Sequence, residues 1–346
     1  MEMKYHFMFI IAILVLSLFI INFFFADIDY DDFFGDRTCG DGTFYEECSL
    51  RKPYYCSDGL LFERASVCGC PEESNRSGDL CPSEYQKNPI DLNLKYTLRG
   101  DERELKYIAY NGMSDYLLDL PKSIDYSNGG SFSRVDFKLK AIEEPEQARL
   151  LEPLVVEIQN TINDEMEQVR IAVSIVQNLE WGWSNRTINF GGFNLNYSRY
   201  PYEVLLDSQG LCGEKSELLA FLLKEMGYGV AIFYNPTENH ESVGIRCPLE
   251  ESWHGTGYCF IETSGPAIIT DSSLEYSGGL RLLSQPQVLF ISEGKALKEG
   301  LPEYKDADKM MNIRDRLNSN GFGLFDGFRL EGLKGKYGLA DIYNLD

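Results

Sequence analysis

The sequence is poor in basic residues and in histidine. It contains 32 lysines and arginines against 54 aspartates and glutamates, which gives a formal net charge of −22, and it has only 3 histidines. Nucleic acids and anionic lipid surfaces attract proteins that carry clustered positive charge. The composition therefore argues against a nucleic-acid partner, and it leaves few candidates for acid–base chemistry at an imidazole.

The sequence also lacks a C-x-x-C pair, although six of its cysteines fall in one short segment. They are separated by 8, 7, 11, 1 and 10 residues with no histidine among them: Cys39, Cys48, Cys56, Cys68, Cys70 and Cys81. Zinc sites of this size use closely paired ligands, so zinc is the weaker alternative. A short segment buries little apolar surface, and we expect three disulfides to stabilise residues 36–84 as a small module. Six cysteines allow 15 pairings, which the spacing does not resolve.

One long apolar run is present near the N-terminus. Phe7 to Ala26 comprises 20 residues with Ser17 and Asn22 as its polar interruptions, which matches the ~20 residues of a membrane-spanning helix. Lys4 precedes the run and several aspartates follow it, so we expect a single-pass anchor (residues 1–26) in the cell membrane, with the N-terminus inside and the rest of the chain outside. A cleaved signal peptide is the alternative. Disulfides and three Asn-x-Ser/Thr triplets suit an extracellular domain.

The remaining chain predicts an α+β domain over residues 94–294 with a core at 160–275. Residues 94–139 contain strand-like pieces, LKYTLRG and SRVDFKLKA, and residues 144–180 have the apolar spacing of helices, with Asn163 and Asp164 as a start signal. Residues 181–205 show no period and predict a long surface loop. Two strands, 228–235 and 257–263, follow a helix, which is typical of an antiparallel sheet packed on that helix. The tail, residues 295–346, predicts one short helix near 306–317.

The stretch Ser208 to Gly227 places a thiol at the start of a helix. Its apolar spacing predicts a helix from Cys212 to Met226 that ends at Gly227. The amides and dipole of a helix N-terminus favour negative charge and so prepare a cysteine as a thiolate nucleophile. Gly210 and Gly213 are expected to leave room for a substrate, and Glu214 or Ser216 to bond amides of the first turn. Six cysteines belong to the module, and Cys247 and Cys259 suit a disulfide across a hairpin. The expected disulfides therefore use eight cysteines and leave the ninth, Cys212, as a thiol.

A thiolate nucleophile needs a histidine oriented by a third group. His240 lies at the start of a predicted strand, whereas His254 lies in a polar loop, so His240 is the better-held candidate. Glu262 ends the following strand. If the two strands pair antiparallel, its carboxylate reaches the imidazole, and Asp271 is the fallback. A buried inert cysteine and an ordinary surface histidine are the plain alternatives.

These residues resemble the transglutaminase-like superfamily, which has a papain-type fold. The resemblance rests on Gly210-x-Cys212-x-x-x-Ser216 and on RYPYEVL, TENHESVGI and YCFIETSGP, and it covers roughly residues 94–275. It is closest to a membrane-anchored prokaryotic, archaeal-looking branch. The resemblance implies a catalytic triad of Cys212, His240 and Glu262 that needs no metal and no cofactor.

The function expected from this triad is that of a cell-surface thiol enzyme. It would act on peptide or carboxamide bonds of a protein or peptide substrate, with the cell envelope as one source of that substrate, through a thioester on Cys212. Resolution by water makes it a peptidase or amidase, and resolution by an amine makes it a protein-glutamine acyltransferase. We favour hydrolysis, because cross-linking requires a site that excludes water. The alternative is a catalytically inactive surface module that binds protein or glycan.

Overall fold

The computed structural model describes residues 37–72, 74–123, 133–319 and 321–340. The predicted membrane span, Phe7 to Ala26, lies outside these ranges. Within them, no helix has both the length and the apolar character that a membrane crossing requires. The membrane anchor and the boundaries of the predicted segments therefore stay predictions.

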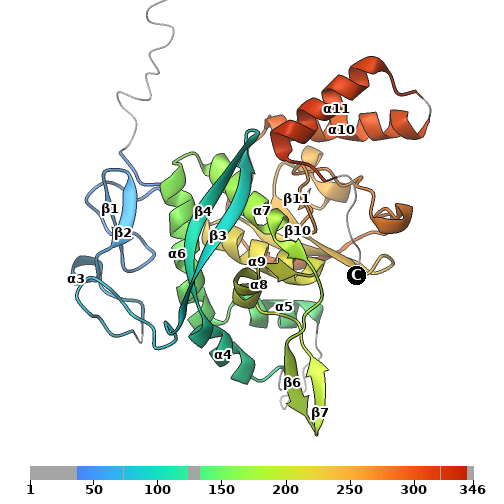
Figure 1. Ribbon diagram of the computed structural model, residues 1–346. Coiled ribbons are helices and arrows are strands. Elements are labelled where there is room, and N and C mark those ends of the chain that lie inside the picture. Colours follow the sequence, from blue (N-terminus) through green and yellow to red (C-terminus); the bar gives the residue numbers. More distant parts are fainter. Residues whose placement is uncertain (1–36, 73, 124–132, 320, 341–346) are drawn as a thin grey trace, which may run out of the picture.

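The centre of the molecule is a four-stranded antiparallel sheet. Its spatial order is β11-β10-β9-β12, with these bounds: β9 Val230–Asn235, β10 His240–Arg246, β11 Tyr258–Ile261 and β12 Gln287–Ser292. Helix α9, Cys212–Glu225, packs on β9 and β10 (Figure 1). Its second and third turns are buried because α7 covers the other side of the helix. The chain is thus a mixed α and β protein, and the fourth strand, β12, was not predicted.

Two helices and a long hairpin complete the core. Helices α6, Pro145–Thr161, and α7, Glu165–Asn178, form where the apolar spacing predicts them. The carboxylate of Asp164 accepts a hydrogen bond from the N–H of Glu167 at 2.8 Å, so the predicted start signal caps α7. The hairpin of β3, Pro89–Leu98, and β4, Asp101–Tyr110, packs against α7 and α6.

Several segments differ from their predictions. SRVDFKLKA forms helix α5, Arg134–Ile142, because Asp136 accepts from the N–H of Ser133 at 2.8 Å and closes the helix start. The segment after β4 forms helix α4, Asn111–Asp119. The region of the predicted loop, residues 181–205, and its flanks contain short elements instead: β5 Glu180–Trp181, β6 Thr187–Phe190, β7 Phe193–Asn196, α8 Pro201–Asp207 and β8 Gln209–Gly210. Gly191 and Gly192 both have positive φ, which permits the tight β6–β7 turn.

The cysteine-rich module contains three disulfides, as predicted. They join Cys39 to Cys56, Cys48 to Cys68 and Cys70 to Cys81 around a small hairpin and one helical turn: β1 Tyr54–Ser57, β2 Leu60–Glu63 and α3 Ala65–Cys68. Leu61 exchanges two hydrogen bonds with the side chain of Asn160 on α6, at 2.8 and 2.9 Å. The module is therefore fixed to the main body as well as cross-linked internally.

The C-terminal tail forms two helices where one short helix was predicted. Helices α10, Pro302–Asn318, and α11, Leu324–Tyr337, lie side by side in Figure 1. Arg316 binds Asp326 across the pair at 2.7 Å, and Glu303 binds Arg170 of α7 at 2.6 Å. Three short 3₁₀ turns occur between β10 and α10: Leu249–Glu251, Trp253–Gly255 and Ser277–Gly279.

Candidate active site

Cys212 is the first residue of helix α9, as the sequence predicts. All nine cysteines lie in the described ranges; eight form four disulfides, including Cys247 with Cys259 across β10 and β11, and Cys212 is the ninth. Its side chain is 2% exposed. Glu214 accepts the N–H of Leu211 at 3.0 Å, so the predicted first-turn bond forms at Glu214. The thiol therefore lies at a capped helix N-terminus.

The space beside the neighbouring glycine is occupied by the protein itself. A Cβ on Gly213 would lie 2.3 Å from Glu241 Oε2 and 3.4 Å from Lys138 Nζ. Lys138, on α5, forms ion pairs with Glu241 at 2.6 Å and with Glu217 at 2.7 Å. The expectation that Gly213 leaves room for a substrate is therefore wrong in this structure. A side chain at position 213 would displace the Glu241 carboxylate that pairs with Lys138, because this charged network from α5 and β10 packs directly onto α9.

His240 and Glu262 lie together in the interior. His240 is the first residue of β10, Glu262 follows β11, and both side chains are fully buried. The Nε2 atom of His240 lies 3.0 Å from Oε2 of Glu262. The antiparallel pairing of β10 with β11 produces this contact, because it places the start of one strand beside the end of the other. His254, the other histidine weighed from sequence, is exposed and lies in a 3₁₀ turn.

The carboxylate of Glu262 is held at both oxygens. Oε1 accepts the N–H groups of Thr263 and Ser264 at 2.8 and 2.7 Å, and Oε2 accepts from His240 and from the hydroxyl of Tyr276. Burial disfavours the charged form, but the charge and hydrogen bonds of His240 and the bonds from Tyr276 and Ser264 outweigh it, lowering the pKa of Glu262 to about 2. Glu262 is therefore ionised at neutral pH.

Tyr276 is a member of this group that the sequence did not reveal. Its hydroxyl donates to Glu262 and lies 3.3 Å from His240 Nε2, and its ring centroid is 4.8 Å from that of the imidazole. The ring is buried in a cluster with Trp253 and Phe260. A lone tyrosine before a glycine-rich turn has no spacing signal, so only the folded structure brings it to the site.

Two hydrogen bonds connect this pair to the first turn of α9. The hydroxyl of Thr263, next to Glu262, donates to the carbonyl of Cys212 at 3.2 Å. Ser216, one turn after Cys212, donates to the carbonyl of Glu241, next to His240, at 3.4 Å and lies 3.1 Å from the Thr263 hydroxyl. The backbones of the three predicted site residues are thus linked through Ser216 and Thr263.

Two buried nitrogens near this group have no hydrogen-bond partner among the described residues. One is Nδ1 of His240 and the other is the indole Nε1 of Trp181. Because the ionised Glu262 accepts at Oε2, the adjacent Nε2 carries a hydrogen, and Nδ1 offers a lone pair whenever the ring is neutral. Trp181 pairs in register with Gly210, two residues before Cys212. The buried hydroxyls of Ser242 and Ser264 also have no partner among the described residues, so the region holds several unused polar atoms.

Lys215 is a buried cation on the same helix. Its ammonium group donates to the carbonyl of Leu179 at 2.9 Å, and its side chain is fully buried. Burial lowers the pKa of Lys215 to about 8, although the negative charges of Glu262 and Cys212 oppose this change. Positive charge at Lys215 favours ionised forms of both neighbours.

Asp271, the fallback for the third group, has a different partner. It is fully buried, but its Oδ1 atom accepts from Arg314 of α10 at 2.7 Å. The structure therefore places Glu262 against His240 and Asp271 against the tail.

Comparisons with known proteins give little further information. No family model matches the chain, and no curated protein matches it. A solved structure of LapG from Legionella pneumophila is similar over 39% of this chain and 75% of that chain, with 15% identity and a TM-score of 0.24. Its calcium-bound form is similar over 48% of this chain and 98% of that chain, with 13% identity and a TM-score of 0.23. TM-scores this low do not establish a shared fold, so the transglutaminase-like resemblance rests on the sequence motifs.

Proposed function

We propose that the protein is a thiol enzyme in which Cys212, His240 and Glu262 act together on a peptide or carboxamide bond. The observation that supports this most strongly is the fully buried contact between His240 and Glu262, fixed to the helix turn that begins with Cys212. A buried carboxylate bonded to an imidazole beside a thiol is the arrangement by which thiol enzymes prepare their nucleophile.

In the proposed acylation, the thiol of Cys212 gives its proton to Nδ1 of His240 and the sulfur attacks the substrate carbonyl. Glu262 holds the Nε2–H side of the ring and stabilises the imidazolium. The imidazolium then protonates the leaving amine or ammonia as the C–N bond breaks, which leaves a thioester on Cys212. The side chain of Glu262 stays ionised throughout.

The negative oxygen formed during the attack requires hydrogen-bond donors. The first amides of a helix have no partner within the helix, and Trp181 Nε1 is a buried donor without a partner in the described part of the chain. We assign these groups to the oxyanion, because donors fixed before the reaction stabilise the transition state without reorganisation.

Water resolves the thioester in the proposed reaction, with His240 removing its proton, and the product is a carboxylate. Hydrolysis needs no binding site for a second substrate, which is why we favour it over transfer to a lysine amine. The three side chains are at most 2% exposed, so a substrate gains access only when residues covering the thiol move. Disulfides in the module and in the β10–β11 hairpin support a site outside the cytosol, on the anchored chain.

The test is product analysis with a peptide library that contains internal bonds, glutamine side chains and lysines. Mass spectrometry distinguishes new termini, deamidation and isopeptide products, and Cys212→Ala is the matched control. The proposal expects one product class that is absent with Cys212→Ala. Identical product profiles for the wild type and Cys212→Ala would contradict it and favour a noncatalytic binding module, a reading that the closed site also permits.

A further inference from the structure

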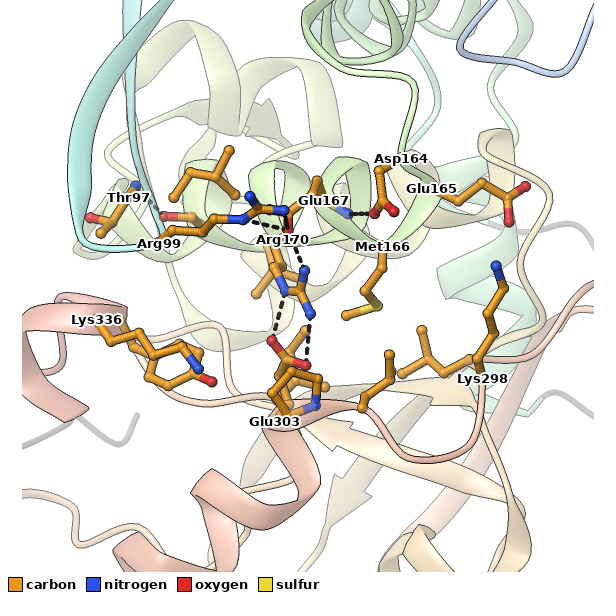
Figure 2. A pocket seen from close by; sticks show the side chains of 18 of the residues that line it. Thr97, Arg99, Asp164, Glu165, Met166, Glu167, Arg170, Lys298, Glu303 and Lys336 are labelled. Atoms are coloured by element: carbon orange, nitrogen blue, oxygen red, sulfur yellow. Dashed lines mark hydrogen bonds and ion pairs between the residues drawn. The ribbon is translucent and has the colours of Figure 1, made fainter. Parts of the chain in front are cut away.

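The C-terminal hairpin of α10 and α11 extends from the edge of the molecule (Figure 1). Its base is tied to the core. Arg170 of α7 donates twice to Glu303 in the first turn of α10, at 2.6 and 2.8 Å, beside a cavity of about 630 Å³ (Figure 2). Lys336 of α11 binds Asp306 of α10 at 2.7 Å. The free end of the hairpin therefore projects from a fixed base, and none of its residues takes part in the proposed reaction.

This free end exposes a group of large apolar side chains. Leu324, Phe325 and Phe328, at the start of α11, are 78%, 77% and 71% exposed, and Phe322 precedes them at 40%. The inner face of the hairpin is buried in a separate apolar cluster. Single exposed apolar residues are ordinary, but four of them within residues 322–328 form a patch of the kind that marks an interaction site. We call these four residues the apolar end.

A small hollow with basic walls lies between the two helices. Its volume is about 320 Å³, and its lining contains no carboxylate: Lys309, Asn312, Ile313, Arg316 and Arg329. Arg329 follows Phe328 directly and lies one turn after Phe325, on the same face of α11. The hollow and the apolar end are therefore neighbouring parts of one surface.

Arg329 is the cation of this hollow that a ligand can bind. Arg316 donates to Asp326 at 3.0 and 2.7 Å. Lys309 binds Asp306 at 2.8 Å. Arg329 is exposed and has no hydrogen-bond or ion-pair partner among the described residues. A guanidinium group is always charged and binds a phosphate with two parallel hydrogen bonds, so the hollow offers an anion a reachable anchor.

The charge of the hairpin differs from that of the chain. Between Lys305 and Lys336 there are seven basic and five acidic residues, whereas the whole chain has a formal net charge of −22. Exposed phenylalanines beside basic side chains are typical of segments that lie in the interface of an anionic bilayer, because the rings enter the acyl region and the cations stay at the phosphates. A second copy docked patch to patch would instead place basic groups against basic groups.

The predicted membrane span would hold this surface near a bilayer. The span ends at Ala26, and the structure describes the chain from Arg37 onward. The ten residues between them reach at most about 33–36 Å. A contact between the hairpin and lipid is then intramolecular, and the high effective concentration of lipid makes even a weak contact effective.

We propose that the end of the α10–α11 hairpin docks on the surface of an anionic phospholipid bilayer. Lipid phosphates bind Arg329 at the hollow, Lys309 and Arg316 add positive charge, and Phe325 and Phe328 enter the acyl region. This second attachment would hold the body of the protein in one orientation on the membrane. The inference is independent of the proposed reaction, because the contact is measured without turnover.

The test is photo-crosslinking of the full-length chain in nanodiscs that contain a trace of a phospholipid with a diazirine in its acyl chain. One set of nanodiscs is made of phosphatidylcholine, which has no net charge, and the other also contains anionic phosphatidylglycerol. Mass spectrometry maps the lipid adducts. Adducts on residues 322–329 should be at least about fivefold more frequent in the anionic nanodiscs, since one basic residue near such a surface contributes about 1 kcal/mol. Equal labelling in the two lipids, or no adducts on this segment, would overturn the proposal.

Two pairs of variants locate the contact. Arg329→Ala should lower the adduct yield on residues 322–329 about fivefold in anionic nanodiscs, whereas Lys106→Ala, which removes an equal charge from an exposed position on β4, should leave it unchanged. Phe325→Ser should lower the yield at least about tenfold. Phe193→Ser is its control, because Phe193 is 72% exposed at the start of β7.

Equal effects of the hairpin variants and their controls would reject the site. Cross-links between two chains through residues 322–329, in place of lipid adducts, would assign the apolar end to a second copy and reject the bilayer.

Discussion

Two fully buried carboxylates follow strand β11, and their surroundings differ. Glu262 lies against His240 at 3.0 Å, whereas Asp271 lies against Arg314 at 2.7 Å. An arginine is always charged, so Asp271 and Arg314 can only hold the tail to the core. An imidazole can take up and release a proton at its ring nitrogens, so the pair of Glu262 and His240 can move a proton.

The surroundings of the two acids reinforce this contrast. The His240 ring has a second nitrogen, Nδ1, without a partner in the described residues, and Glu262 receives further donors from Tyr276 and two amides. Arg314 instead donates to both Asp271 and Ser273, and the hydroxyl of Ser273 donates to Asp271. Burial alone therefore does not mark a functional acid. Both pairs include a buried atom without a partner in the described residues, Nδ1 of His240 and Oδ2 of Asp271, so the feature that separates the two regions is the titratable partner of Glu262.

The largest expected effect comes from replacing the imidazole. His240→Gln keeps a donor for Glu262 but removes the base, so product formation should fall by about a thousandfold or more. Circular dichroism and thermal unfolding should show a folded protein. A His240→Gln variant that keeps more than a tenth of the wild-type rate, while Cys212→Ala is inactive, would rule out His240 as the base.

Removing the partner of the other acid should affect stability instead. Arg314→Met leaves Asp271 buried and unpaired, which should lower the free energy of unfolding by about 3–5 kcal/mol. Urea denaturation measures this loss, and the rate per folded molecule should remain near that of the wild type. Adding Asp271→Asn to Arg314→Met removes the unpaired charge and should recover part of the loss. No recovery, or a lower rate per folded molecule, would show that Asp271 has a role beyond the tail.

The pH dependence of stability should distinguish Glu262 from an ordinary carboxylate. Its pKa is about 2 in the folded protein against an ordinary 4.5, so its stabilising contribution is present above about pH 4.5 and is lost as the pH falls through about 2. The difference corresponds to about 3 kcal/mol. Urea midpoints of the wild type and Glu262→Gln should therefore approach each other between pH ~5 and ~2. A constant gap would mean that the charged form of Glu262 is not stabilised by His240 and Tyr276.

The smallest effect is expected at Tyr276. Tyr276→Phe keeps the ring against Trp253 and removes one donor from Glu262, which should cost about 1–3 kcal/mol and displace the pH–rate profile of Cys212 alkylation. A structural role alone would lower the unfolding temperature without moving that profile. Tyr304→Phe is the control, because its buried hydroxyl bonds the carbonyl of Lys298 at 3.0 Å, away from this site.

Local spacing made part of this structure predictable. The apolar positions after Cys212 predict helix α9. Cys212, His240 and Glu262 lie at the ends of a helix and two strands that follow one another closely in the sequence, and such elements usually pack side by side. Alternating apolar residues in SRVDFKLKA predicted a strand, but capping at Ser133 and ion pairs of Lys138 with α9 and β10 stabilise helix α5. Tyr276 and the Asp271–Arg314 pair depend on contacts between distant segments, which no local pattern carries.

The most direct test of the central claim is alkylation of Cys212 by iodoacetamide. The full-length chain in nanodiscs would be labelled between about pH 4 and about pH 9, and mass spectrometry would quantify the modified site in the wild type and in His240→Ala. If Cys212 and His240 form a thiolate–imidazolium pair, Cys212 should be labelled selectively with an apparent pKa well below the ~8.5 of a free thiol, and that pKa should rise in His240→Ala. An unreactive Cys212, or a labelling profile that does not change in His240→Ala, would contradict it.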